Sequence, residues 1–151
     1  MDDSLRELYQ EVILDHSRHP RHFGRLEHAT NSAQGYNPLC GDRVTVYLSV
    51  GEDGRIADIK FEGKGCAISQ ASASLMTDMI VGKTVAEAEK LMGGFLNLVK
   101  GEEIEGLSED DRETLNVMAG VSAFPMRVKC ATLAWHTMKS ALEGGETAKT
   151  E

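Results

Sequence analysis

The residues best suited to chemistry in this sequence are its three cysteines, each of which lies at a boundary between predicted elements. Cys40 lies in a loop just before a predicted strand, Cys66 at a strand-to-helix turn, and Cys130 in the first turns of the last predicted helix. Arg127 and Lys129 lie beside Cys130, and cations near a helix N-terminus lower the pKa of a thiol. We therefore expect Cys130 to ionise readily, and a thiolate is what both metal binding and sulfur transfer require.

A carboxylate accompanies the first cysteine. Asp42 follows Cys40 by two residues, so in a strand the two side chains point to the same face. With the other two cysteines they make a set of three thiols and one carboxylate, which zinc accepts in tetrahedral geometry: Cys40, Asp42, Cys66 and Cys130. The set contains no Cys-x-x-Cys pair, because the cysteines lie 26 and 64 residues apart. From the chemistry alone, a shared metal site and three unrelated core cysteines are equally good interpretations.

Length and composition favour one cytoplasmic domain. The 151 residues and the 41% hydrophobic content suit a single domain with its own core, which needs no disulfide. We expect this domain to span residues 1–145 and residues 146–151 to form a disordered tail. The acidic start, with no apolar segment after it, predicts that there is no signal peptide. In a reducing cytosol, cysteines serve as metal ligands or reactive thiols more often than as disulfides.

The charge balance narrows the range of partners. With a net charge of −8, the chain lacks the basic footprint that nucleic-acid binding needs. No apolar run approaches the roughly 18 residues that a membrane span needs. We therefore expect neither a nucleic acid nor a membrane as a partner.

Hydrophobic periodicity predicts the elements that must position the thiols. Residues 42–50 and 56–62 are predicted to form an antiparallel hairpin, with a third strand over residues 30–36. Residues 93–106 are expected to form a loop or a short helical excursion. The chain order predicts an α+β domain with an N-terminal helix, a small, about three-stranded antiparallel sheet and C-terminal helices packed on one face. The helices are predicted over residues 4–17, 66–81, 84–92, 108–121 and 125–144.

Several local sequences, taken in order, resemble one family. They are Leu8–His16, His19–Gly24, Cys40-Gly41-Asp42, Gly63–Ser74 and Lys129-Cys130. These segments resemble the U-type iron–sulfur cluster assembly family, of the IscU/NifU N-terminal type, and the resemblance runs over about residues 5–142. The three cysteine motifs are jointly specific, although each alone is not.

Two features resemble the SufU-type branch, which belongs to the SUF pathway. Lys129 stands where the scaffold branch has a histidine before its third cysteine, and residues 93–113 look like an extra segment. The resemblance implies a zinc-dependent sulfurtransferase whose Zn²⁺ is bound by Cys40, Asp42, Cys66 and Cys130.

The same resemblance implies a role and partners for the first thiol. Cys40 would accept sulfur from a PLP-dependent cysteine desulfurase and serve downstream iron–sulfur assembly proteins. Arg127 is a candidate catalytic residue that steers the exchange or holds a liganding group, and a surface cation at the start of the last helix is the equal alternative.

Two other functions use the same thiols. One is a scaffold on which a [2Fe–2S] or [4Fe–4S] cluster is assembled and passed to apo-proteins. The other is a structural zinc module, but such sites usually take closely spaced cysteine and histidine ligands, which this set does not. The scaffold branch also has a Leu-Pro-Pro-Val-Lys segment that its chaperone recognises. Residues 123–127 keep only one proline and one basic residue of it, which argues against an Hsp70-type chaperone as a partner.

Overall fold

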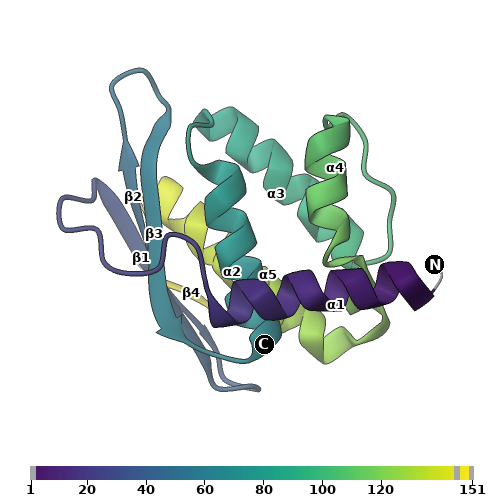
Figure 1. Ribbon diagram of the computed structural model, residues 1–151. Helices are drawn as coiled ribbons and strands as arrows, with labels where there is room; N and C mark the ends of the chain where they lie inside the picture. The colour runs from purple at the N-terminus through teal and green to yellow at the C-terminus, as the bar shows by residue number, and fades with distance from the viewer. Residues whose placement is uncertain (1–2, 145–146, 150–151) are drawn as a thin grey trace.

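The computed structural model describes residues 3–144 and 147–149, and Figure 1 shows how their elements are arranged. Within these residues, no helix combines the length and apolar character that crossing a membrane requires. The predicted α+β order is confirmed. In chain order the elements are α1 (Asp3–Arg18), β1 (Asn31–Asn37), β2 (Asp42–Val50), β3 (Ile56–Lys64), α2 (Ala67–Ile80), α3 (Val85–Val99), α4 (Glu109–Asn116), the 3-10 helix η1 (Ala119–Ala123), α5 (Pro125–Leu142) and β4 (Thr147–Lys149).

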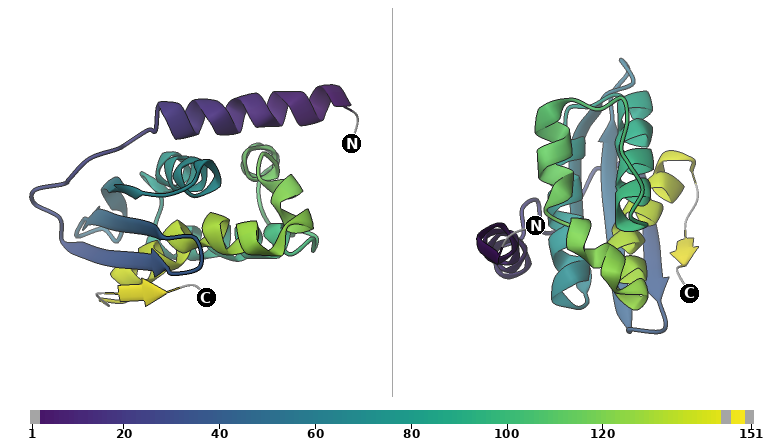
Figure 2. Two further views of the ribbon diagram at one scale, coloured as in Figure 1. Left: turned by 90° about the horizontal axis from the view of Figure 1, so that it is seen from below. Right: turned by 90° about the vertical axis from the view of Figure 1, so that its right-hand side faces the viewer.

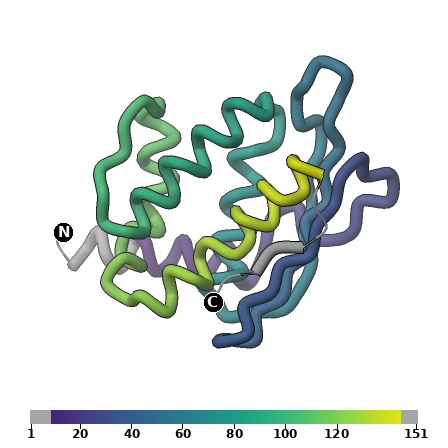
Figure 3. The backbone as a smooth tube through the Cα atoms, turned by 180° about the vertical axis from the view of Figure 1, so that it is seen from behind, coloured from purple at the N-terminus to yellow at the C-terminus, as the bar shows by residue number. Residues whose placement is uncertain are grey.

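A mixed sheet lies on one side of the molecule, with its strands in the order β3-β2-β1-β4. The neighbours β1, β2 and β3 are antiparallel, as predicted, and alternate residues of β2 (Val44, Val46 and Leu48) are buried. Figure 1 shows the helices on one side of the sheet, with α5 packed on β1 and β2 and α2 packed on β3. Figure 2 shows α1 on the outer side of α2, away from the sheet. The turns β1–β2 and β2–β3 lie at opposite ends of the sheet (Figure 3).

The C-terminal tail departs from the prediction. The sequence predicts disorder for residues 146–151, but residues 147–149 form β4, which pairs in parallel with β1. An edge strand such as β1 presents unpaired backbone groups that a further strand can satisfy. Gly144, at φ 80°, ends α5 in the left-handed conformation that suits glycine. The other residues of this tail lie outside the described residues.

Helix α5 runs antiparallel along β1 and carries the third cysteine to the end of that strand. Gly35 of β1 lets the helix approach closely, because a Cβ at this position would lie 1.9 Å from Thr137 Oγ1. Nearer the start of α5, the sulfur of Cys130 contacts the side chain of Asn37, the last residue of β1. Cys130 therefore lies beside the turn that holds Cys40.

Helix α3 is longer than predicted. The sequence predicts that this helix ends near residue 92, but it continues through Gly93 and Gly94 to residue 99. Burial of Phe95, Leu98 and Val99 offsets the helix penalty of about 1 kcal/mol for each glycine. Gly94 also allows the following segment to fold back on the helix, because a Cβ there would lie 2.7 Å from the side chain of Leu107.

The helix predicted over residues 108–121 is correct at its start and too long at its end. Ser108 caps α4 as predicted, with its side chain accepting a hydrogen bond from the backbone N–H of Asp111. The α-helix then ends at Asn116, and η1 follows before α5 begins. Gly120 lies in this interrupted stretch, where its low helix propensity favours the break.

A buried hydroxyl anchors α1 to α2. Ser74 Oγ lies 2.7 Å from His16 Nδ1 and accepts a hydrogen bond from the backbone N–H of Arg21 at 2.8 Å. The Ser74 oxygen accepts the hydrogen bond from Arg21, and its hydroxyl proton can be donated to Nδ1 of a neutral His16. Burial, together with the charge of Arg21, lowers the pKa of His16. This contact fixes the N-terminal helix to the helix that Cys66 caps.

Candidate metal centre

Three separate parts of the fold bring the predicted ligands to one end of the sheet. Cys40 lies in the turn between β1 and β2, and Asp42 is the first residue of β2. Cys66 is the N-cap residue of α2, and Cys130 lies in the second turn of α5. The antiparallel register of β2 and β3 sets the start of one strand beside the end of the other, which is why Asp42 and Cys66 meet.

The sulfur and carboxylate atoms are close enough to share one ion. The ligand atoms of Cys40, Asp42 and Cys130 all lie within 4.8 Å of one another. The Sγ atoms of Cys40 and Cys130 are 3.2 Å apart. Cys66 borders this group without completing it: its Sγ lies 4.0 Å from Asp42 Oδ2, but it is not among the mutually close atoms. Three of the four predicted ligands converge, and the fourth meets them at Asp42.

Asp42 is buried and is held in place by the residues that precede α2. The backbone N–H of Cys66 donates a hydrogen bond to Asp42 Oδ1 at 3.0 Å. A Cβ at Gly65 would lie 2.9 Å from the same oxygen. The sulfur of Cys66 accepts a hydrogen bond from the backbone N–H of Ser69 at 3.4 Å, as an N-cap does. The local sequence around Gly65 therefore makes room for the carboxylate and supplies its donor.

Cys130 does not have the lowered pKa that its neighbours in sequence predict. Burial raises the pKa of this thiol well above its usual value, and the adjacent Cys40 and Asp42 raise it further. The residue lies beyond the first turn of α5, where the effect of the helix dipole fades. A buried thiol beside a carboxylate loses its proton when a nearby cation compensates the charge, as a bound metal ion does.

Arg127 lies at the surface near Cys66 and Cys130, and its predicted role in steering the exchange stays a prediction. It is exposed at the start of α5, about one turn before Cys130. The Cys66 and Cys130 sulfurs, in their deprotonated forms, attract its guanidinium and raise the pKa of that group. Arg127 is therefore an exposed cation that lies near the sulfur atoms of Cys66 and Cys130.

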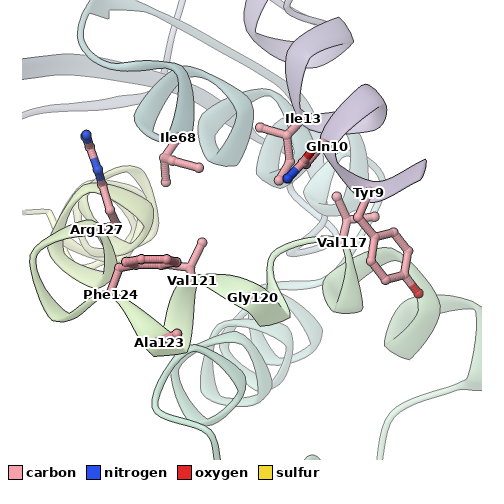
Figure 4. A pocket seen from close by; sticks show the side chains of 10 residues that line it. All are labelled: Tyr9, Gln10, Ile13, Ile68, Val117, Gly120, Val121, Ala123, Phe124 and Arg127. Atoms are coloured by element: carbon pink, nitrogen blue, oxygen red, sulfur yellow. The ribbon is translucent and has the colours of Figure 1, made fainter. Parts of the chain in front are cut away.

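An apolar groove has this arginine among its lining residues. It has a volume of about 570 Å³ and lies between α1, η1 and the start of α5, with Arg127 at one edge (Figure 4). No motif in the sequence predicts this groove, because its walls come from segments more than 100 residues apart. The residues that line it are Tyr9, Gln10, Ile13, Ile68, Val117, Gly120, Val121, Ala123, Phe124 and Arg127.

Sequence reasoning missed Asn37 as a residue of this centre. Its side chain is fully buried, and its amide nitrogen donates to Cys130 Sγ at 3.7 Å. The available signal was the Asn37-Pro38 dipeptide, which marks a turn just before the first cysteine. That signal gives no indication of a contact with a cysteine 93 residues further along the chain.

Comparison with known proteins shows the class to which this fold and centre belong. Residues 8–131 match the family described as the NifU-like N-terminal domain. The chain belongs to this family, so the resemblance inferred from the cysteine motifs is confirmed.

Individual relatives carry two kinds of name. One is the iron–sulfur cluster assembly scaffold protein IscU of Streptococcus pyogenes serotype M1, with 41% identity over 96% of this chain and 89% of the relative. Another is the zinc-dependent sulfurtransferase SufU of Bacillus subtilis, with 39% identity over 94% of this chain and 96% of the relative. A crystal structure from Fervidobacterium islandicum, described as a candidate scaffold for the SUF system, superposes with a TM-score of 0.81 and 39% identity, covering 91% of this chain and 98% of that one.

Proposed function

We propose that this protein is a zinc-dependent sulfurtransferase of iron–sulfur cluster assembly, which accepts the persulfide sulfur of a PLP-dependent cysteine desulfurase on Cys40. The placement of this residue carries the proposal. Cys40 lies partly exposed in a hairpin turn, next to Leu39 with 57% of its surface exposed, whereas Cys130 is fully buried. A protein partner can therefore approach Cys40 but not Cys130. Cys66 is half-buried as well, but it caps a helix, and the family resemblance favours Cys40 in its hairpin turn as the acceptor.

The donor set fits zinc. A tetrahedral zinc ion with Zn–S bonds of about 2.3 Å places two thiolate sulfurs about 3.8 Å apart. The Sγ atoms of Cys40 and Cys130, at 3.2 Å, lie closer than this value. Cys66 Sγ and Asp42 Oδ2, at 4.0 Å, lie further apart than the roughly 3.5 Å expected for a sulfur and an oxygen on one tetrahedral zinc ion, so both pairs need shifts of about 0.5 Å to share the ion. The residues that would hold the ion are Cys40, Asp42, Cys66 and Cys130. When bound, zinc keeps these thiols deprotonated, which offsets the burial that opposes ionisation of Cys130.

The transfer itself is a thiol exchange at sulfur. The thiolate of Cys40 attacks the outer sulfur of the desulfurase persulfide and forms a new S–S bond. The old S–S bond breaks, its electron pair leaves on the desulfurase cysteine as a thiolate, and the outer sulfur stays on Cys40. The step is redox-neutral and needs no other reactant. Arg127 lies near Cys66 and Cys130, and its positive charge would offset the negative charge of the centre during the transfer.

Exposed apolar side chains beside the thiols support a protein partner. Leu39 precedes Cys40 in the hairpin turn, and Phe124 and Met126 flank the start of α5 with 61% and 58% of their surfaces exposed. Apolar side chains clustered at a reactive group are typical of a docking surface for another protein. We propose the desulfurase for this surface, with downstream iron–sulfur assembly proteins receiving the sulfur.

A cluster scaffold is the second candidate. The relative from Streptococcus pyogenes carries that name, and three thiols gathered at one end of the sheet are the usual ligands of a [2Fe–2S] or [4Fe–4S] cluster. The same residues serve either function. A sulfurtransferase would hold zinc in the centre, whereas a scaffold would hold an iron–sulfur cluster.

Metal content and desulfurase turnover distinguish the two candidates. We expect the aerobically purified protein to carry one zinc per chain, to be colourless, and to increase sulfide release when added to a cysteine desulfurase with cysteine. A brown cluster that transfers to an apo-protein would support the scaffold instead. Unchanged desulfurase turnover at saturating amounts of this protein would contradict the sulfurtransferase proposal.

A further inference from the structure

The side chain of Asn37 connects the two segments that carry Cys40 and Cys130. Its amide nitrogen donates a hydrogen bond to Cys130 Sγ at 3.7 Å. Its amide oxygen accepts a hydrogen bond from the backbone N–H of Leu39 at 3.2 Å, within the turn that holds Cys40. The residue is 0% exposed and lies opposite Asp42 in the register of β1 and β2. One buried amide thus contacts Cys130, lies opposite Asp42 and binds the residue that precedes Cys40.

The chemistry of the amide matches what a buried thiolate needs. A protonated Cys130 can donate to the backbone carbonyl of Met126, which lies 3.6 Å from its sulfur. A thiolate has no proton to donate, so it needs donors, and the Asn37 amide supplies one in a place closed to water. Residues that hydrogen-bond a metal ligand from behind fix its orientation and tune how tightly it holds the metal.

We propose that Asn37 is a positioning residue of the metal centre. Its N–H group holds the sulfur of Cys130 toward Cys40, and its oxygen fixes the turn that presents Cys40 to a partner. This inference rests on the proposed function, because the metal-bound thiolate is the state that the amide stabilises.

A matched pair of substitutions at the two ends of β1 separates this role from ordinary packing. Asn37→Ser keeps a side-chain oxygen that can accept from the backbone of the turn, but its short side chain does not reach Cys130. Asn31→Ser is the control: Asn31 also donates to α5, at 2.8 Å, but to the backbone carbonyl of Ala141 at the far end of the helix. Both variants lose one amide contact between β1 and α5, and only the first loses the contact with sulfur.

Two readouts report on the sulfur directly. In zinc competition against a chromophoric chelator, we expect Asn37→Ser to lose about 10–100-fold in affinity, and Asn31→Ser to bind zinc like the wild type. In the cobalt-substituted proteins, the thiolate-to-cobalt charge-transfer bands should shift for Asn37→Ser and stay in place for Asn31→Ser. Equal zinc affinities and unchanged bands in the Asn37→Ser variant would overturn the proposal, whatever happens to its melting temperature.

Two nuclear magnetic resonance measurements test the contact between Asn37 and Cys130 if the Asn37→Ser variant does not fold or the protein holds no metal. In cadmium-113-loaded protein, a coupling between cadmium and the Asn37 side-chain amide proton supports the contact, and its absence overturns it. If the wild type takes up no metal, the proposed function fails by itself. The inference is then decided in the metal-free protein: the Asn37 amide resonance should move in Cys130→Ala, and an unchanged resonance overturns the contact.

Discussion

Replacing Gly65 with alanine should disturb the metal centre through a single steric contact. The added methyl group would lie 2.9 Å from Asp42 Oδ1 and 3.0 Å from Ser69 Oγ. The Ser69 hydroxyl can rotate, although its Cβ at 3.1 Å stays close; Asp42 is only 1% exposed and is bonded to the backbone N–H of Cys66 at 3.0 Å. To avoid the methyl group, the carboxylate must move away from that donor.

The size of the effect follows from this geometry. Overpacking of a buried site costs about 1–3 kcal/mol, and a hydrogen bond to a charged group contributes about 1.5–3 kcal/mol. We expect the metal-free Gly65→Ala protein to lose about 2 kcal/mol, which for a chain of this size lowers the melting temperature by about 4–8 °C. Zinc affinity should fall as well, because the displaced carboxylate is a proposed ligand.

Thermal unfolding of the metal-free protein and zinc competition measure the two effects. The Asp42→Ala background provides the internal control, since removing the carboxylate should make Gly65→Ala less costly; neighbours in contact are not additive. A Gly65→Ala protein that melts and binds zinc like the wild type would refute the reasoning. An equal penalty in both backgrounds would show that Asp42 is not the group being displaced.

Other substitutions test the fold around the centre. Gly93→Ala adds a Cβ to the exposed face of α3, where nothing lies within 4 Å, and should raise the free energy of unfolding by about 0.5–1 kcal/mol in a denaturant titration. Gly35→Ala should destabilise the protein by at least about 1–3 kcal/mol, because its Cβ would lie 1.9 Å from Thr137 Oγ1; the same titration should show partial recovery when Thr137→Ala is added. Burial lowers the pKa of His16, so below pH 6.5 the unfolded chain takes up a proton that the folded protein does not. The free energy of unfolding should therefore fall as the pH drops below this value, and His16→Asn should reduce that fall; an unchanged pH profile would contradict the effect of burial.

Sequence patterns predicted the elements wherever the local signal and the tertiary contacts agree. The alternation of Val44, Val46 and Leu48 predicted β2 with its correct bounds, because one face of that strand packs on the helices. The glycine pair at residues 93–94 predicted an early end to α3, since glycine weakens an isolated helix. The close approach of Leu107 to Gly94 and the burial of Phe95 stabilise the helix beyond the glycine pair. Neither feature can be predicted from the local sequence.

The centre was predictable in its members but not in its physical details. The motifs pointed to Cys40, Asp42, Cys66 and Cys130, and the fold brings three of their ligand atoms together with Cys66 at the border. The cations next to Cys130 in the sequence predicted a lowered pKa for its thiol. Burial of the side chain has the larger effect and raises that pKa. The role of Asn37 depends on a contact across 93 residues, which only the packing of α5 along β1 creates.

The identity of the thiol that receives sulfur tests the central claim most directly. The zinc-loaded protein is incubated with a cysteine desulfurase and cysteine, quenched with an alkylating reagent, digested and analysed by mass spectrometry. We predict one additional sulfur atom on the peptide that contains Cys40, no such addition on the peptides of Cys66 and Cys130, and no transfer to a Cys40→Ser variant that still binds the desulfurase. Sulfur found first on Cys66 or Cys130, or transfer that persists in Cys40→Ser, would contradict the account.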